Sequence, residues 1–181
     1  MASESVFVLF GSNLGDRQLL VNQACKIVEE RCGKINAQSC FYETEPWGFK
    51  SEHWFLNKVV EITTSLSPDV MMRTLLEIES ELGRDRVGRH EGYVSRPMDI
   101  DILYYGSQII DTQLIKVPHP RLHQRRFTLM PLCDIAPDFV HPILKKTNRQ
   151  LLDECTDSGI VFVKTDEYLS ENDKNRKNIT L

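Results

Sequence analysis

The feature that most constrains this chain is the segment from Arg96 to Gly106, which reads R-P-M-D-I-D-I-L-Y-Y-G. Its apolar residues at 98, 100 and 102 alternate with Asp99 and Asp101. An alternation with a period of two predicts a β-strand with two unlike faces, so both carboxylates point the same way, with Cβ atoms about 6.6 Å apart. Such a pair either converges on a metal ion or forms part of a solvated outer face.

Basic residues flank this strand in a chain that is acidic overall. The net charge of -4 argues against general nucleic-acid affinity. Arginines nevertheless concentrate between residues 84 and 96, and residues 116–126 carry basic side chains and no acid. Local basic segments beside paired acids favour a small polyanionic ligand.

Length and composition are those of one globular domain with a tail: 181 residues, 41% of them hydrophobic and 27% charged. We expect residues 1–164 to form this domain and the polar residues 165–181 to be poorly ordered. The N-terminus lacks a basic region and a long apolar run, so we expect a cytoplasmic protein with no membrane partner. We also expect a monomer. Five cysteines without C-x-x-C spacing argue against a zinc site and a disulfide framework.

The order of the predicted elements indicates the fold class. Periodicity and capping residues predict strands at 6–10, 35–44, 54–64 and around Asp99, with helices from Asp16 to Gly33 and from Ser67 to Gly83. Strand, helix, strand, strand, helix, strand is the order of an α+β, ferredoxin-like βαββαβ sandwich, in which an antiparallel sheet has two helices on one face and a ligand cleft on the other. The C-terminal extension adds short strands at 108–111 and 114–117, a short helix or turn at 131–136 and an edge strand at 159–164.

Three features allow both a structural and a functional interpretation. The Gly11–Gly15 segment lacks the G-K-[ST] ending of a phosphate loop, which favours a flexible turn with backbone donors. Asn57 lies between apolar residues on one strand face, so it is either a satisfied structural amide or a ligand contact. The aromatic residues near the Thr44 turn would suit a flat heterocycle, although most aromatic side chains belong to a core; they are Phe41, Tyr42, Trp47, Trp54 and Phe55.

Paired carboxylates beside clusters of arginine and histidine suit phosphoryl-type transfer from a nucleotide triphosphate. Carboxylates hold Mg²⁺ against the phosphates, and guanidinium groups neutralise the charge that shifts as the bond breaks. The sequence shows no Ser/His/Asp or Cys/His nucleophile set. Two other functions stay open: a non-catalytic nucleotide-binding regulatory module and a two-metal nucleotidyltransferase.

R-P-M-D-I-D-I-L-Y-Y-G closely resembles the signature of the 6-hydroxymethyl-7,8-dihydropterin pyrophosphokinase family of folate biosynthesis. The resemblance covers roughly residues 6–142 in the family's order, through further segments that begin at Gly11 (G-S-N-L), Phe41 (F-Y-E-T), Leu56 (L-N), Gly83 (G-R-D-R), Val117 (V-P-H) and Arg125 (R-R-F). It implies transfer of the β,γ-diphosphate of ATP to the hydroxymethyl group of the dihydropterin, with release of AMP. ATP is then a co-substrate, and two Mg²⁺ ions act as cofactors.

The resemblance also implies roles for individual residues. Asp99 and Asp101 match the metal-binding acids, and Asp101 also resembles a carboxylate placed to take up the hydroxyl proton. The positions that match pterin contacts are Thr44, Pro46, Phe55, Asn57 and Phe127. Those that match groups at the triphosphate are Arg84, Arg86, Arg96, His119 and Arg125, while Glu79 and Ile102 resemble contacts to the nucleoside end. Of these, the residues expected to act in catalysis are Arg84, Arg96, Asp101, His119 and Arg125.

Overall fold

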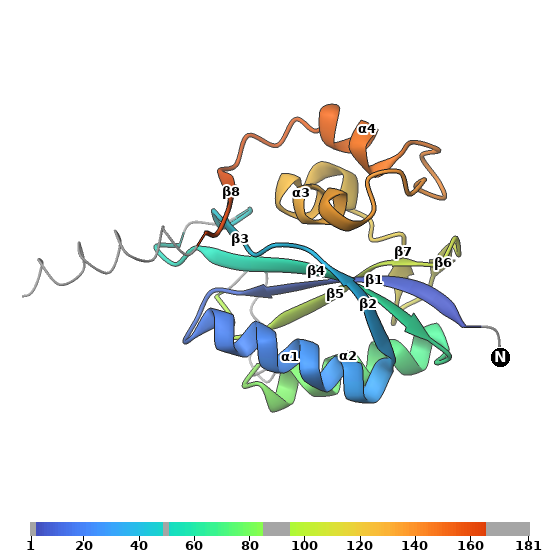
Figure 1. Ribbon diagram of the computed structural model, residues 1–181, viewed down its shortest axis with the longest axis horizontal. Coiled ribbons are helices and arrows are strands. Elements are labelled where there is room, and N and C mark those ends of the chain that lie inside the picture. The colour runs from blue at the N-terminus through green and yellow to red at the C-terminus, as the bar shows by residue number, and fades with distance from the viewer. Residues whose placement is uncertain (1–2, 49–50, 85–94, 166–181) are drawn as a thin grey trace, which may run out of the picture.

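The computed structural model describes residues 3–48, 51–84 and 95–165. Its centre is a sheet of six strands in the order β5-β1-β4-β3-β8, with β2 also paired to β4 (Figure 1). The strands are β1 (Glu4–Ser12), β2 (Lys34–Gln38), β3 (Tyr42–Thr44), β4 (Phe55–Thr64), β5 (Asp99–Tyr105) and β8 (Val161–Val163). A separate pair is formed by β6 (Ile110–Asp111) and β7 (Lys116–Val117).

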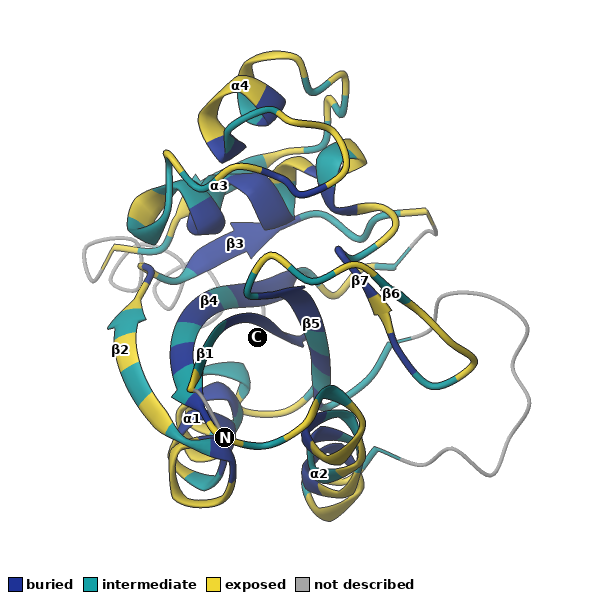
Figure 2. Ribbon diagram, turned by 90° about the vertical axis from the view of Figure 1, so that its right-hand side faces the viewer, coloured by how far each residue is buried: buried dark blue, intermediate teal, exposed yellow. Residues whose placement is uncertain are grey.

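Helices cover both faces of this sheet. The helices α1 (Arg17–Cys32) and α2 (Pro68–Glu81) lie on one face, while α3 (Arg126–Ile135) lies on the other with α4 (Asn148–Asp153) stacked outside it. A short 3₁₀ turn, Leu122–Gln124, leads into α3. Figure 2 shows that the helix surfaces turned toward the sheet are the buried ones.

The expected βαββαβ order is confirmed, with β1 between β4 and β5 and every pairing antiparallel. The single strand predicted at 35–44 is divided into β2 and β3, which both pair with β4. Residues 39–41 separate them, although the Ser39 amide still donates to the Val59 carbonyl at 2.9 Å. The division leaves β3 as a separate short strand that also pairs with β8.

Local sequence signals account for the two helices on the first face. The Asp16 side chain accepts a hydrogen bond from the Leu19 amide at 3.0 Å, and Ser67 caps α2 in the same way with Pro68 in the first turn. Gly33 ends α1 with φ at 143°, where an added Cβ would lie 2.2 Å from the Thr63 carbonyl oxygen. These caps confirm the predicted helix boundaries.

The second face of the sheet is partly covered by a core that the sequence pattern did not reveal. Apolar residues of β1, β4 and β5 pack there against α3 and α4; the buried members are Phe7, Leu9, Val59, Leu103, Tyr104, Leu122, Leu129, Leu132 and Leu151. Only a short helix or turn was predicted at 131–136, because Pro131 disfavours a helix interior, whereas α3 begins at Arg126 and contains Pro131. The ligand cleft is therefore confined to the part of this face that α3 leaves open.

A bulge limits the alternating segment of β5. The pairing with β1 shifts between Phe7 and Val8, so Leu103 and the next residue, Tyr104, both belong to the α3-side core. The alternation that places Asp99 and Asp101 on one face holds only before this point.

No helix in the described ranges is long and apolar enough to cross a membrane. The poorly ordered tail predicted at 165–181 lies outside the described residues, apart from Thr165.

Candidate functional site

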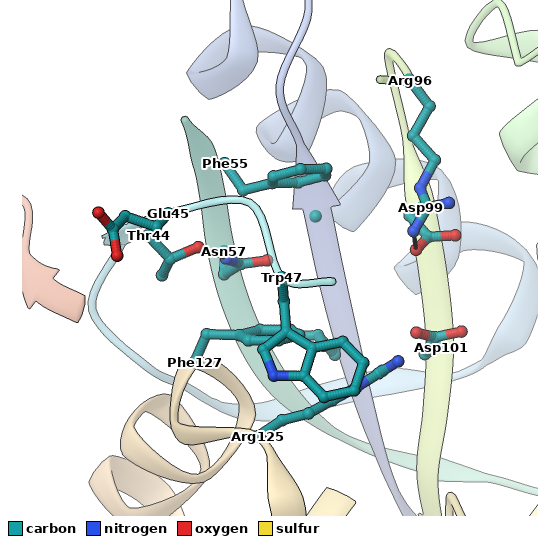
Figure 3. Close-up of a pocket in the computed structure, with 12 residues that line it drawn as sticks. Thr44, Glu45, Trp47, Phe55, Asn57, Arg96, Asp99, Asp101, Arg125 and Phe127 are labelled. Carbon is teal, nitrogen blue, oxygen red and sulfur yellow. Dashed lines mark hydrogen bonds and ion pairs between the residues drawn. The ribbon is translucent and has the colours of Figure 1, made fainter. Parts of the chain in front are cut away.

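A pocket opens on the second face of the sheet, beside α3. Its floor comes from β1, β4 and β5, and its walls come from the segment after β3 and from the start of α3 (Figure 3). The residues that line it are Leu9, Gly11, Thr44, Glu45, Trp47, Phe55, Asn57, Arg96, Asp99, Asp101, Arg125 and Phe127. The pocket thus collects residues that are far apart in the chain, and those among them that were predicted as site residues are Thr44, Phe55, Asn57, Arg96, Asp99, Asp101, Arg125 and Phe127.

Asp99 and Asp101 both line the pocket, as the alternation predicts. The apolar residues between and beside them pack in the opposite direction, in the core against α1 and α2. Ile102 is one of these and is only 4% exposed. Its side chain does not reach the pocket, so the predicted contact of Ile102 with a nucleoside would have to come from its main chain.

Two arginines hold the carboxylate of Asp99. Arg84 Nη1 donates to one oxygen and Arg96 Nη2 to the other. Arg84 Nη1 also lies 2.5 Å from Glu79 Oε1, which accepts the Ile100 amide at 2.7 Å. Because Glu79 is 1% exposed, the structure places this predicted nucleoside contact beneath the surface, as an anchor for Arg84 and for β5.

Asp101 lies next to this cluster, partly exposed on the pocket floor. Burial, followed by the negative charge of Asp99, raises the pKa of Asp101 to about 7, against the opposing positive charges of Arg125 and Arg96. A carboxylate in this range can exchange a proton near neutral pH.

His119 does not line the pocket, but the positive charge of the pocket residue Arg125 acts on its imidazole. Burial, followed by the positive charges of Arg125 and Arg121, lowers the pKa of His119 to about 4. Its Nδ1 accepts a hydrogen bond from the Arg121 amide at 3.2 Å. At neutral pH His119 is therefore an uncharged imidazole whose proton is on Nε2, which makes it a hydrogen-bond donor rather than a cation.

The other half of the pocket is largely aromatic. In Figure 3 the rings of Phe55 and Phe127 flank the side chain of Asn57. Asn57 is 2% exposed, and its Nδ2 donates to Thr44 Oγ1 at 2.7 Å. The amide is thus a satisfied structural group, and because it also lines the pocket its contact with a ligand stays a prediction.

Gly11 is a pocket residue that sequence reasoning missed. The prediction of a turn at this position is wrong, because Gly11 extends β1 and pairs with Asn57 on one side and Asp99 on the other. A Cβ built on Gly11 would lie 3.0 Å from Asn57 Oδ1 and 4.0 Å from Asp99 Cβ. Gly11 therefore keeps open the pocket floor between the aromatic half at Asn57 and the charged half at Asp99. The signal that could have indicated this role is a glycine at the end of an apolar strand.

Arg125 joins the two halves of the pocket. Its guanidinium lies 4.7 Å from the centre of the Trp47 ring and 5.5 Å from that of Phe127, and the residue is 6% exposed. Pro46 stands between the lining residues Glu45 and Trp47 without lining the pocket itself. Arg86 lies outside the described residues.

The carboxylate pair has the donor set of an incomplete metal site. No group of three or more His, Cys, Asp or Glu side chains within residues 3–48, 51–84 and 95–165 could hold a metal ion. Mg²⁺ is commonly bound by one or two carboxylates, and water and substrate phosphates complete its shell. Asp99 and Asp101 therefore fit Mg²⁺ that is bound together with a phosphorylated ligand.

Comparisons with known proteins identify the family. Residues 7–137 match the family model described as 7,8-dihydro-6-hydroxymethylpterin-pyrophosphokinase (HPPK). The chain is 43% identical over 138 residues to 2-amino-4-hydroxy-6-hydroxymethyldihydropteridine pyrophosphokinase of Porphyromonas gingivalis, covering 76% of this chain and 93% of that protein. It is 38% identical over 152 residues to the protein of the same name from Aquifex aeolicus, covering 84% and 92%.

Solved structures agree at the level of the fold. The crystal structure of a Plasmodium falciparum HPPK-DHPS triple mutant superposes with a TM-score of 0.67 at 16% identity, covering 84% of this chain. The match covers 44% of the solved chain, so this protein spans less than half of it. From the family model and the relatives, we conclude that the chain belongs to the 7,8-dihydro-6-hydroxymethylpterin-pyrophosphokinase family.

Proposed function

We propose that this protein transfers the β,γ-diphosphate of ATP to the hydroxymethyl group of 6-hydroxymethyl-7,8-dihydropterin. The products are AMP and the dihydropterin methyl diphosphate, and the reaction is a step of folate biosynthesis. Family membership supports the proposal. The observation that carries it is one pocket in which a carboxylate pair with its arginines faces an aromatic slot that contains Asn57 and Thr44.

The aromatic half is suited to the pterin. A flat ring stacks between apolar faces such as those of Phe55 and Phe127, and the polar edge of the ring needs hydrogen-bond partners at the side of the slot. Asn57 and Thr44 supply such groups and are already held by their mutual hydrogen bond. We include Pro46 as a further contact, through the segment that carries Trp47.

The charged half is suited to the triphosphate. Arg84 and Arg96 are paired with Asp99, and a bound triphosphate would offer these guanidinium groups new anionic partners. We propose that Asp99 and Asp101 hold two Mg²⁺ ions, which would offset the negative charge of the phosphates. Arg86 and the main chain at Ile102 are proposed as further ATP contacts.

Five residues are proposed to act in catalysis: Arg84 and Arg96 at the triphosphate, together with Asp101, Arg125 and His119. Asp101 lines the pocket beside Asp99 and is placed to accept the proton of the attacking hydroxyl. Arg125 lies where the two halves meet and can neutralise charge on the transferred group. His119 contributes as a neutral donor through Nε2 rather than as a positive charge.

The test is to incubate the protein with ATP, Mg²⁺ and the hydroxymethyl-dihydropterin and to identify the nucleotide product. AMP that forms only when the pterin is present supports the proposal. Release of inorganic diphosphate would indicate a nucleotidyltransferase instead, and binding of ATP without any product would indicate a regulatory module.

A matched pair of variants strengthens this assay. Asp101→Ala removes an acid from the pocket, whereas Asp111→Ala removes an acid that is 76% exposed in an ion pair with Lys116 on β6 and β7. Only the first should abolish AMP formation.

We further propose that the protein works as a monomer in the cytoplasm, without nucleic-acid or membrane partners.

A further inference from the structure

A segment near the C-terminus ties the two walls of the aromatic slot together. Residues 157–164, which we call the C-terminal strap, follow α4 and include β8, and they lie beyond residues 7–137 of the family match. In Figure 1 the strap runs from α4 past α3 to the edge strand beside β3.

The strap contacts the first wall at the start of α3. Asp157 Oδ2 accepts a hydrogen bond from the Arg126 amide at 3.0 Å, and Asp157 Oδ1 accepts one from the Gly159 amide at 3.1 Å. Arg126 is the first residue of α3 and stands between two pocket residues, Arg125 and Phe127. Asp157 therefore fixes the turn from which both of these side chains project.

The strap contacts the second wall at the end of β3. The Glu45 amide donates to the Ile160 carbonyl at 3.1 Å, and the Ile160 amide donates to Glu45 Oε2 at 2.9 Å. The next residue, Val161, pairs with Thr44 in the β3–β8 ladder. Both Thr44 and Glu45 line the pocket, so the strap holds the backbone on each side of the slot.

The far end of the strap is anchored at β3 and beside the start of β4. Glu43 is 8% exposed and forms two hydrogen bonds with Arg17, at 2.7 and 2.9 Å, while Lys164 Nζ lies 3.9 Å from its Oε1. The ring of Phe162 lies 5.8 Å from that of Trp54, next to Phe55. A strap held at both ends can set the separation of the walls between them.

We propose that the C-terminal strap is a positioning element for the pterin half of the site, with Asp157 as its main positioning residue. The inference rests on the proposed function. It predicts a selective effect, because β8 and β5 are at opposite ends of the strand order, four steps apart, or roughly 19 Å at the usual strand spacing. When the strap is loosened, Asp99 and Asp101 with Arg84 and Arg96 should therefore bind ATP almost as before. Among the contacts proposed for the described residues, only that of Arg125, next to Arg126, would be affected on the nucleotide side.

The experiment compares Asp157→Ala with the wild type. Calorimetry measures the binding of Mg-α,β-methylene-ATP, which blocks diphosphate transfer, and then the binding of the hydroxymethyl-dihydropterin to that complex. We expect the dissociation constant for the pterin to rise about tenfold, since two hydrogen bonds to a charged acceptor are lost. The dissociation constant for the nucleotide should rise by no more than about threefold, because of its proposed contacts within the described part of the chain only that with Arg125 lies next to the strap.

Two further variants distinguish positioning from general destabilisation. Asp157→Asn keeps one oxygen acceptor for the Arg126 amide and should recover most of the pterin affinity. Asp153→Ala removes an exposed acid at the end of α4, outside the strap, and should leave both dissociation constants unchanged. If Asp157→Ala does not fold, Lys164→Ala is the milder variant and should show the same selectivity with a smaller loss.

Unchanged pterin affinity in Asp157→Ala would overturn the proposal, as would equal losses for pterin and nucleotide or the same loss in Asp153→Ala. Hydrogen exchange gives a readout that does not need substrate: the amides of residues 44–45 and 126–129 should exchange faster in Asp157→Ala. A wild-type protein that makes no AMP would count against the proposed function, whereas a strap without effect in an active enzyme would count only against this inference.

Discussion

The two halves of the pocket differ in how their polar groups are arranged without ligands. In the aromatic half, the Asn57–Thr44 hydrogen bond holds the amide in place between rings. In the charged half, Asp99 is held by Arg84 and Arg96, so that groups proposed to bind metal and phosphate bind each other. The polar groups of the aromatic half are joined by one hydrogen bond, while the charged groups of the other half are paired with each other.

This difference follows from the electrostatics of the site. A buried carboxylate or guanidinium is costly unless it is paired, so opposite charges that await a ligand pair internally. Asp101 lies next to the paired Asp99, and its pKa is raised because burial and the charge of Asp99 disfavour a second carboxylate anion there. An aromatic slot carries no such cost and needs only rigid walls. Substitutions in the charged half should therefore affect turnover most, and those in the aromatic half should affect pterin binding.

The largest effect is expected from the acids. Asp99→Ala and Asp101→Ala should lower turnover by more than about 10³-fold, because each removes a proposed metal ligand. Thermal unfolding should show a nearly intact fold, since neither side chain belongs to an apolar core. The AMP assay measures the loss, with Asp111→Ala as the control. Activity within tenfold of the wild type in either variant would contradict the proposal that this acid is a metal ligand.

Two arginines test whether the charged half acts on turnover more than on ATP binding. Arg84→Ala and Arg125→Ala should lower kcat by about 10²-fold, if they act on charge that develops during transfer. Their effect on ATP binding should be smaller, and calorimetry with the methylene analogue separates the two quantities. Equal losses in kcat and in ATP affinity would indicate ordinary ground-state contacts instead. Arg84→Ala also leaves the buried Glu79 without this partner, so a lower thermal midpoint is expected for that variant.

Gly11 tests the boundary between the halves. In Gly11→Ala the new methyl group would lie 3.0 Å from Asn57 Oδ1 but 4.0 Å from Asp99 Cβ. We expect the pterin dissociation constant to rise by about tenfold because Asn57 must move, with a smaller change for nucleotide. A loss that falls mainly on ATP binding would show that Gly11 belongs to the charged half.

The smallest effect concerns His119 and pH. Its pKa is about 4 in the folded protein, below the ordinary value of 6.5, so the unfolded chain binds more protons between these values. The contribution of His119 to stability is therefore complete above pH 6.5 and is lost as the pH falls toward 4. His119→Gln should lack this loss, which urea unfolding at several pH values would detect. An identical pH dependence in both proteins would mean that His119 is not buried near Arg125 as described.

Much of the fold and of the site could be predicted because the signals are local. A period of two placed Asp99 and Asp101 on one face, and the caps at Asp16 and Ser67 located α1 and α2. Most of the residues that the family resemblance indicated do meet in one pocket. The roles proposed for them stay predictions until the variants are measured.

What could not be predicted depends on contacts between distant segments. The sequence does not indicate that Glu79 is buried, in contact with Arg84 and bonded to the Ile100 amide. The edge strand at 159–164 was predicted, but its hydrogen bond from Ile160 to Glu45 joins residues 115 positions apart. Neither contact can be predicted from a short window of sequence, because its two partners lie far apart in the chain.

Period, capping and charge are properties of neighbouring residues, so the sequence was enough to predict the alternation of β5, the boundaries of α1 and α2 and the chemical character of the site. Three features follow only from the packing of the whole chain: α3 covers part of the second face, Gly11 lies between the two halves of the pocket, and the strap bridges its walls. These features arise when strands and helices from the whole chain pack together, and their energies depend on which distant atoms come into contact.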